Sequence, residues 1–278
     1  MLAKVFYCQK KTEKKTMDTI SPTQDALLQY SNRVAYQAGM WFTSLSSATP
    51  ESYIVGGSDA NITDYPYTCS LRYSGVHSCG CVILSSTKIL TSAQCVDGRE
   101  IHLFSVVAGQ SDRRLGTPKA LSDVHIHEEF NTGSFTLYND LATGTFESPL
   151  DTSDPGIAAG IIAGAGDNFD GSSCHVTGWG RTNGSVPELP IILQVGNTTA
   201  IDAATCQAGV GLGYIGDGHI CAQQNSTTIC ISDLGNPLWC GGKIAGIASW
   251  NIITNGVYRS DHPSVFVRLS HYQDWIEH

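Results

Sequence analysis

The chain has 278 residues, of which 41% are hydrophobic, 15% are charged and 29 are glycine. This composition favours a folded, turn-rich protein over a disordered one. The formal net charge of −9 argues against nucleic acid as a partner. No apolar run approaches the ~18–20 residues that a membrane-spanning helix needs, so we expect no membrane span.

The first 53 residues differ from the rest of the chain in charge. They carry six basic and four acidic side chains, a net charge of +2, whereas residues 54–278 carry ten basic and 21 acidic side chains, a net charge of −11. Little in residues 1–53 alternates or packs, so we interpret them as a pro-segment or N-terminal tail, mostly disordered. The opening residues MLAKVFYCQKK lack the apolar stretch of roughly 7–15 residues that marks a secretory signal.

From Ile54 the sequence changes to short apolar or alternating runs, separated by Gly, Asn, Asp and Ser. The expected strands are residues 82–84, 88–90, 102–107, 174–177, 191–195, 244–250 and 265–269. Many short strands with frequent turns predict an all-β sandwich or barrel. The stretch Ser270 to Gln273 fits a capping box, which predicts a short C-terminal helix through Trp275 and Ile276.

Cysteines and glycosylation motifs bear on the compartment. Ten cysteines in 278 residues are many for a reducing compartment. The N-glycosylation sequon occurs four times, at Asn61, Asn183, Asn197 and Asn225. Each sequon alone is a weak signal, but together with the cysteines they favour a secreted, extracellular protein.

Seven landmarks follow one another in order from Ile54 onward. They are IVGG at 54–57, CGC at 79–81 followed by TSAQC at 91–95, NDLA at 139–142, GWG at 178–180, CISDLGNPL at 230–238, SW at 249–250 and DWI at 274–276. With these landmarks and cysteine spacings, residues 54–278 resemble the chymotrypsin-like (trypsin-like) serine proteases. The resemblance implies two packed antiparallel β-barrels, a short C-terminal helix and an active site in the cleft between the barrels.

The resemblance also locates a catalytic triad, in which two of the three residues are replaced. Gln94 stands in place of the base, Asp140 retains the orienting carboxylate, and Leu234 stands in place of the nucleophilic serine. An amide neither accepts nor releases a proton near neutral pH, and leucine has no nucleophilic atom. Ser232 replaces a glycine whose N–H helps to form the oxyanion hole, and its Cβ penalises the backbone angles that glycine permits. We therefore expect no active catalytic residue and no protease activity.

The resemblance marks a specificity pocket and an activation ion pair as well. The pocket floor is Thr228 rather than an aspartate, and Asn251 and Ser264 occupy two wall positions that are glycine in trypsin-like members. Side chains there are expected to narrow or block the pocket. Asp233 matches the carboxylate that pairs with the new amino terminus, here that of Ile54, after a pro-segment is removed. The residue before Ile54 is Tyr53, whereas trypsin-activated members have Lys or Arg there. Either a different protease trims this chain or the chain is never trimmed.

Cysteine pairing follows in part from the resemblance, which implies the disulfides Cys79–Cys95, Cys174–Cys240 and Cys206–Cys221. We expect a fourth, Cys69–Cys81, because both cysteines fall on strands that should pair in the first barrel. Cys8 and Cys230 are left over, and sequence alone does not determine connectivity. His125 and His127 could face one way on a strand, but no cysteine or third histidine lies near them, so we expect no metal and no cofactor.

Gln and Leu at the triad resemble the inactivated serine protease paralogues of the scabies mite, which are relatives of the mite group 3 allergens. This resemblance implies a secreted pseudoprotease that binds host defence proteins, notably complement components, through a surface on the barrels. We expect the protein to be a monomer. Two alternatives stay open. One is a decoy that sequesters protease inhibitors or substrates through the old cleft, which requires an open pocket. The other is a residual serine-type endopeptidase.

Overall fold

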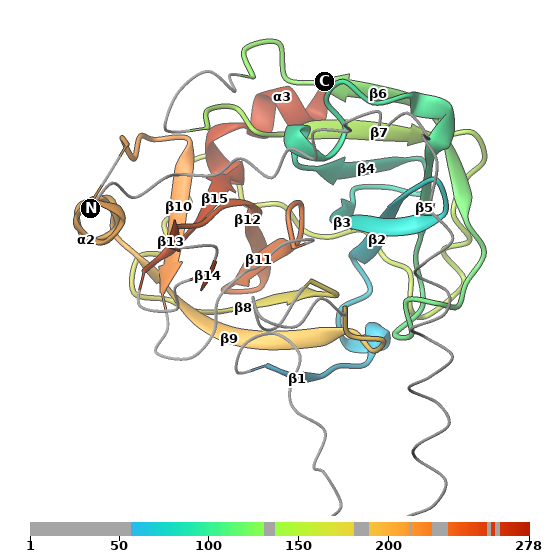
Figure 1. The fold of residues 1–278 in the computed structure, drawn as a ribbon, viewed down its shortest axis with the longest axis horizontal. Coiled ribbons are helices and arrows are strands. Elements are labelled where there is room, and N and C mark those ends of the chain that lie inside the picture. Colours follow the sequence, from blue (N-terminus) through green and yellow to red (C-terminus); the bar gives the residue numbers. More distant parts are fainter. Residues whose placement is uncertain are drawn as a thin grey trace, which may run out of the picture. The chain divides into compact units, whose positions relative to one another are not determined.

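The computed structural model describes residues 57–130, 137–180, 189–211, 213–223, 233–254, 257–258 and 262–278 (Figure 1). Outside this part lie residues 1–53 and six further residues singled out in the sequence: Ile54, Asn183, Asn225, Thr228, Cys230 and Ser232. Within it, no helix has the length and apolar character needed to cross a membrane. The same residues contain no cluster of three or more His, Cys, Asp or Glu side chains suited to a metal ion.

Six antiparallel strands close into the first barrel. In order around the barrel they are β2 (Thr68–Tyr73), β3 (Val76–Ile83), β4 (Lys88–Thr91), β7 (Ala142–Phe146), β6 (Lys119–Ile126) and β5 (Phe104–Val107). Successive side chains of a strand point to opposite faces, so one set fills the barrel interior. Leu71, Ile83 and Ile89 belong to that set and are fully buried.

Six further strands form the second barrel, which closes through the pairing of β8 with β9. In order they are β8 (Ser173–Gly178), β9 (Gln194–Ile201), β10 (His219–Gln223), β15 (Ser264–Arg268), β12 (Lys243–Trp250) and β11 (Pro237–Cys240). Strand β1 (Ser58–Asp59) adds to the edge of β9, and β13 (Ile253–Thr254) pairs with β14 (Val257–Tyr258). The expected pair of antiparallel barrels is confirmed (Figure 1).

One hydrophobic cluster joins the two barrels. Val82, Leu90 and Leu141 from the first barrel pack with Ile247 and Val267 from the second, and all five are buried. Helix α3 (Gln273–Glu277) covers this cluster with two further side chains, Trp275 and the buried Ile276. Because interiors pack as densely as organic crystals, this junction holds side chains from the two barrels in defined positions.

Short helices fill several connections. They are the 3-10 turns η1 (Ile62–Asp64), η2 (Ala93–Cys95), η3 (Ile101–Leu103) and η4 (Leu269–His271), and the α-helix α2 (Ala203–Val210). Sequence reasoning missed α2, although its signals are present. The Asp202 side chain accepts a hydrogen bond from the Thr205 N–H at 2.9 Å, and Gly211 ends the helix at a φ of 67°.

Three sequence expectations about local structure need correction. The strand expected at 102–107 begins only at residue 104, after η3, and the strand expected at 191–195 begins at Gln194. The C-terminal helix exists, but the predicted capping box is wrong, because Tyr272 is the N-cap residue and makes no side-chain cap. Gln273 instead accepts a hydrogen bond from the Ala165 N–H at 2.7 Å, so a tertiary contact takes the place of the local cap.

Four disulfides cross-link the barrels internally. They are Cys69–Cys81, Cys79–Cys95, Cys174–Cys240 and Cys206–Cys221, the same four pairs that the sequence analysis expected. The Cys69–Cys81 pair connects directly opposed residues of β2 and β3. The Cys79–Cys95 pair ties β3 to η2, which carries Gln94, so it anchors the segment on which the candidate site depends.

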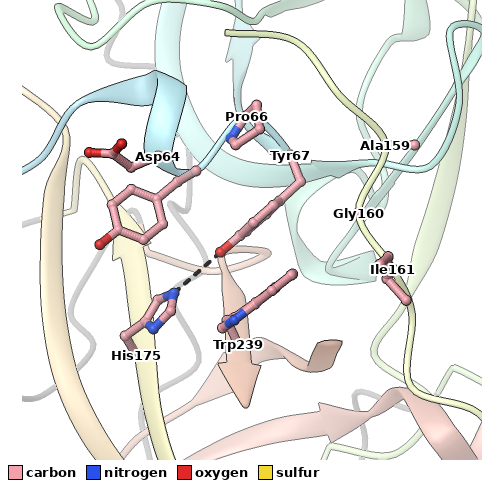
Figure 2. Close-up of a pocket in the computed structure, with 9 residues that line it drawn as sticks. Asp64, Pro66, Tyr67, Ala159, Gly160, Ile161, His175 and Trp239 are labelled. Carbon is pink, nitrogen blue, oxygen red and sulfur yellow. Dashed lines mark hydrogen bonds between the residues drawn. The ribbon is translucent and has the colours of Figure 1, made fainter. Parts of the chain in front are cut away.

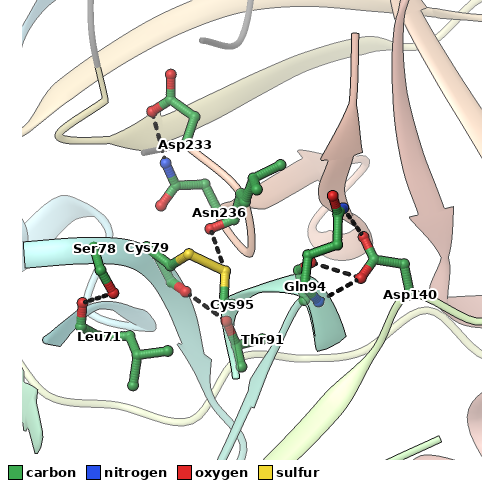
Figure 3. The surroundings of a disulfide bond; sticks show 12 residues. Leu71, Ser78, Cys79, Thr91, Gln94, Cys95, Asp140, Asp233 and Asn236 are labelled. Atoms are coloured by element: carbon green, nitrogen blue, oxygen red, sulfur yellow. Dashed lines mark hydrogen bonds between the residues drawn. A yellow bond between two sulfur atoms is a disulfide. The ribbon is translucent and has the colours of Figure 1, made fainter. Parts of the chain in front are cut away.

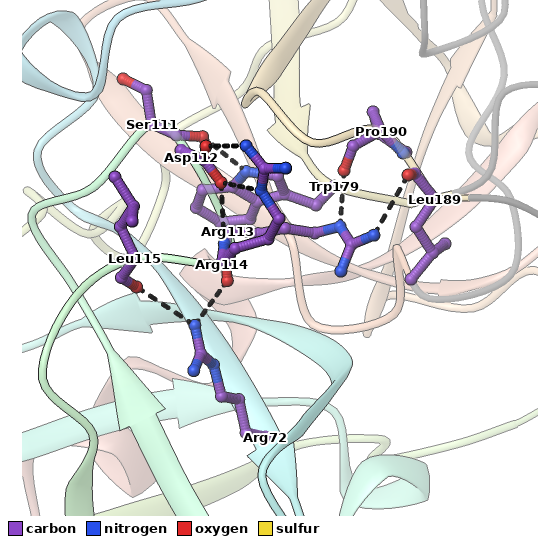
Figure 4. A network of polar contacts seen from close by, with 9 residues as sticks. All are labelled: Arg72, Ser111, Asp112, Arg113, Arg114, Leu115, Trp179, Leu189 and Pro190. Atoms are coloured by element: carbon purple, nitrogen blue, oxygen red, sulfur yellow. Dashed lines mark hydrogen bonds and ion pairs between the residues drawn. The ribbon is translucent and has the colours of Figure 1, made fainter.

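The loop between β5 and β6 is tied to the segment that leads into β9 (Figure 4). The Arg113 guanidinium donates to the carbonyl oxygens of Pro190 at 2.7 Å and Leu189 at 3.3 Å. The indole N–H of Trp179 donates to the Ser111 carbonyl at 2.9 Å. These bonds link the barrels at a second place, because the two connected segments belong to different barrels.

Candidate functional site

Asp140 lies at the junction of the barrels, two residues before the start of β7. The preceding residue, Asn139, has a φ of 53°, in the left-handed region that a non-glycine residue enters at some cost. Two contacts hold it there: its amide donates to the Glu129 carbonyl at 2.9 Å, and its Oδ1 accepts from the Tyr272 hydroxyl at 2.7 Å. This turn places the Asp140 side chain inside the protein, where it is fully buried.

Four donors surround the Asp140 carboxylate. Oδ1 accepts from the Ser92 hydroxyl at 2.7 Å and from the Gln94 N–H at 3.0 Å. Oδ2 accepts from Gln94 Nε2 at 2.7 Å and from the Ser249 hydroxyl at 2.6 Å. Burial raises the pKa of Asp140 to about 6, against the lowering effect of these hydrogen bonds. The carboxylate is therefore ionised at pH 7 and fully engaged within the protein.

The side-chain orientation of Gln94 follows from this arrangement (Figure 3). Its Nε2 donates both to Asp140 and, at 2.9 Å, to the carbonyl oxygen of Ser249 in β12. Both amide hydrogens are thereby used, and the amide bridges η2 of the first barrel to a strand of the second. An amide oxygen does not take up a proton near neutral pH, so this group cannot serve as a general base.

Leu234 lies in a tight turn that presses against the first barrel. Its carbonyl accepts a hydrogen bond from the Gly80 N–H at 2.8 Å, and its half-buried side chain packs against the core of that barrel. Gly235 has a φ of 80°, and a Cβ there would run into Gly80 and Thr91, so only glycine fits this turn. The turn presents a hydrocarbon side chain with no atom able to attack a carbonyl.

Asp233 and Asn236 fill a space that glycines leave open. Asp233 is 2% exposed and accepts from the Gly180 N–H at 2.9 Å and from Asn236 Nδ2 at 2.8 Å. A Cβ on Gly80 or Gly178 would overlap the Asn236 side chain, and one on Gly180 would overlap Asp233. The carboxylate that the resemblance assigns to the activation ion pair thus has an internal amide donor. Ile54, its expected partner, lies outside the described residues.

The two expected pocket-wall residues lie within hydrogen-bonding distance of each other. Asn251 Nδ2 donates to the Ser264 hydroxyl at 3.3 Å, and both residues are buried. Asn251 Oδ1 also accepts from the Ile252 N–H at 2.7 Å, which fixes the amide. A side-chain bridge therefore spans the two wall positions. The expected floor residue Thr228 and the oxyanion position Ser232 lie outside the described residues.

An imidazole does approach a hydroxyl elsewhere in the first barrel. His77 Nδ1 and Ser70 Oγ share a hydrogen bond of 2.8 Å between β3 and β2. His77 is 6% exposed and Ser70 is 1% exposed, and the ring packs edge-on against Trp179. A serine oxygen buried in this way is out of reach of a substrate, so the pair does not replace the altered triad.

Sequence reasoning missed three residues of the site. Ser92 and Ser249 lie in the motifs TSAQC and SW, but a hydroxyl directed at a carboxylate distant in sequence leaves no local pattern that would indicate its role. Asn236 carried a usable signal, since it stands where the family motif Gly-Asp-Ser-Gly-Gly-Pro has its last glycine. Of the four sequons, Asn61 and Asn197 are exposed, and the other two lie outside the described residues.

Comparison with known proteins identifies the family of this chain. The trypsin family model matches residues 54–276. Fibrinolytic enzyme isozyme C of Lumbricus rubellus is 36% identical over 238 residues, which cover 80% of this chain and 98% of that protein. Trypsin eta of Drosophila erecta is 31% identical over 240 residues, with 83% and 91% covered.

Solved structures show the same fold. The scabies mite inactivated protease paralogue S-D1 is similar with a TM-score of 0.72 and 29% identity, over 81% of this chain and 96% of that one. Neuropsin from mouse brain, at 21% identity and a TM-score of 0.70, shares the fold over 80% of this chain and 97% of its own. By the family match and the identity to its relatives, this chain belongs to the trypsin family.

Proposed function

We propose that this protein is a secreted, catalytically inactive member of the trypsin family that acts by binding other proteins. The proposal is carried by one observation: the amide of Gln94 has both hydrogens engaged, and Leu234 packs its side chain against the first barrel. In a serine protease, loss of the base or the nucleophile alone lowers kcat on the order of 10⁶-fold, or about 8 kcal/mol of barrier.

Secretion is supported by the four disulfides, which persist in oxidising compartments and are rare in reducing ones. The exposed sequons at Asn61 and Asn197 are compatible with the same compartment. The proposed partners are host defence proteins, with complement components first. Support for these partners comes from the likeness to the scabies mite inactivated paralogue and not from the geometry of the site.

The hydrogen bond between Asn251 and Ser264 weighs against the decoy alternative. A decoy for protease inhibitors must accept a side chain of the inhibitor in the specificity pocket, and these two side chains meet across the wall positions. Residual endopeptidase activity is the remaining alternative, and it is favoured only by the names of the curated relatives, several of which are trypsins.

Labelling with a fluorophosphonate probe tests inactivity directly. The probe forms a covalent bond with an activated serine, so we expect the intact mass of the full chain to stay unchanged while an active trypsin is labelled in the same tube. Stoichiometric addition of the probe would overturn the proposal and support residual endopeptidase activity.

A haemolysis assay with serum complement tests the proposed partners. We expect the purified protein to inhibit lysis in proportion to its concentration, and prior treatment with fluorophosphonate to leave that inhibition unchanged, because no catalytic serine takes part. The heat-denatured protein serves as the control. Lysis unaffected by native protein would remove complement from the proposal.

A further inference from the structure

A small pocket lies apart from Gln94, Asp140 and Leu234. Its volume is about 280 Å³, and it is formed by the end of η1 and the segment that leads into β2, by residues 159–161, and by β8 and β11 (Figure 2). Pockets for drug-sized ligands span ≈ 300–1,000 Å³, so this one is of a size for a single side chain. The lining residues that matter are Asp64, Tyr65, Tyr67, Ile161, His175 and Trp239.

Aromatic rings form its inner wall and fix one another. Tyr67 stacks on Trp239 with ring centroids 4.7 Å apart and planes 4° from parallel. The rings of Tyr65 and His175 form an edge-to-face pair, with centroids 5.2 Å apart. The Tyr67 hydroxyl and His175 Nε2 share a hydrogen bond of 3.3 Å, visible in Figure 2. The rings are therefore held in place before any ligand arrives, which reduces the entropy lost on binding.

Only one lining residue carries a charge at neutral pH. Burial lowers the pKa of the His175 imidazole and raises that of the Tyr67 hydroxyl, so both groups are neutral. Asp64 is exposed at the rim and supplies a carboxylate. The formal net charge of the whole chain is −9. Aromatic walls, a rim carboxylate and a negative protein all favour a cation over an anion or a neutral group.

We propose that this pocket is a recognition site for an arginine side chain presented by a partner protein. A guanidinium is planar, stacks on aromatic faces and bonds a carboxylate through two N–H groups at once, whereas an ammonium is a compact, strongly hydrated charge. The aliphatic stem of the arginine would lie along Ile161, whose side chain is 62% exposed. The proposal rests on the proposed binding function only in that the partner is a protein.

The test uses a small probe, so that it does not depend on knowing the partner. Nα-acetyl-arginine methylamide is titrated into the full chain while the indole N–H resonance of Trp239 is followed by NMR, with Trp239→Phe used to assign it. The matched probe is the citrulline analogue, which has nearly the same shape and no charge. We expect a millimolar Kd for the arginine probe and about tenfold weaker binding of the citrulline probe.

Two variants distinguish the effect of the Asp64 carboxylate on binding from the effect of the protein's net charge. We expect Asp64→Asn to weaken arginine binding about threefold, because an exposed ion pair contributes little more. Asp97→Asn removes the same charge at another exposed residue, which lies outside the pocket, and should leave the Kd unchanged. Equal binding of the two probes, no shift of the Trp239 resonance, or equal effects of the two variants would each overturn the proposal.

Failure of this site and failure of the proposed function give different results. If the chain inhibits complement but does not distinguish the two probes, the pocket proposal falls and the proposed function stands. If the chain binds the arginine probe selectively but has no effect on complement, the pocket stands and another partner protein is required.

Discussion

Gln94→Met removes the amide from the junction of the barrels and leaves a side chain of similar length. Two hydrogen bonds disappear, one of 2.7 Å to the Asp140 carboxylate and one of 2.9 Å to the Ser249 carbonyl. Net contributions are about 1.5–3 kcal/mol for a bond to a charged group and about 0.5–1.5 kcal/mol for a neutral one. We therefore expect the free energy of unfolding to fall by about 2–4.5 kcal/mol.

Urea unfolding followed by tryptophan fluorescence measures this loss, and the Tm should fall by roughly 4–18 °C for a domain of this size. Gln110→Met is the matched control, because Gln110 is half-buried and its side chain makes no hydrogen bond with the described residues. If both variants lose the same small amount, below ~0.5 kcal/mol, the amide is not a link between the barrels and the reasoning fails.

Three further predictions concern pH, packing and repair. The pKa of Asp140 is about 6 in the folded protein against an ordinary 3.8, so the folded protein binds this proton more tightly than the unfolded chain does. The free energy of unfolding should therefore fall by about 3 kcal/mol as pH rises from about 4 to 6. Urea unfolding at several pH values should show a weaker pH dependence of this free energy for Asp140→Asn. Gly178→Ala should cost about 1–3 kcal/mol through overlap with Asn236, and adding Asn236→Gly should recover part of it, whereas strict additivity in unfolding titrations would contradict the overlap. The double variant Gln94→His with Leu234→Ser should not gain normal peptidase activity, because the pocket walls remain bridged; efficient hydrolysis of peptide substrates would disprove that obstruction.

The short alternating runs predicted an all-β fold, and the ordered motifs, through the family that they resemble, implied the two barrels and three of the four disulfides. Such runs and motifs are local features, which can be recognised from the sequence alone. Local reasoning failed where a tertiary contact replaced a local one. Gln273 bonds Ala165 instead of capping its own helix, and Gln194 begins a strand three residues later than the apolar run suggested.

The proposed inactivity could be argued without any coordinates. A leucine and a glutamine lack the necessary atoms wherever they lie, so once the motifs align, covalent identity alone determines what Leu234 and Gln94 are unable to do. The contacts that these two side chains make depend on the fold. No pattern in the sequence indicates that the Gln94 amide spans from Asp140 to Ser249.

Tertiary structure likewise decided which distant residues share a surface. Asp64 and His175 are 111 residues apart in the sequence, and Trp239 follows His175 by a further 64 residues, yet all three line one pocket. Asn251 and Ser264 became a bridge only because β12 and β15 pair in one barrel. Hydrogen bonds and ring contacts depend on distances of a few ångströms in space, and strand pairing, not sequence separation, sets those distances.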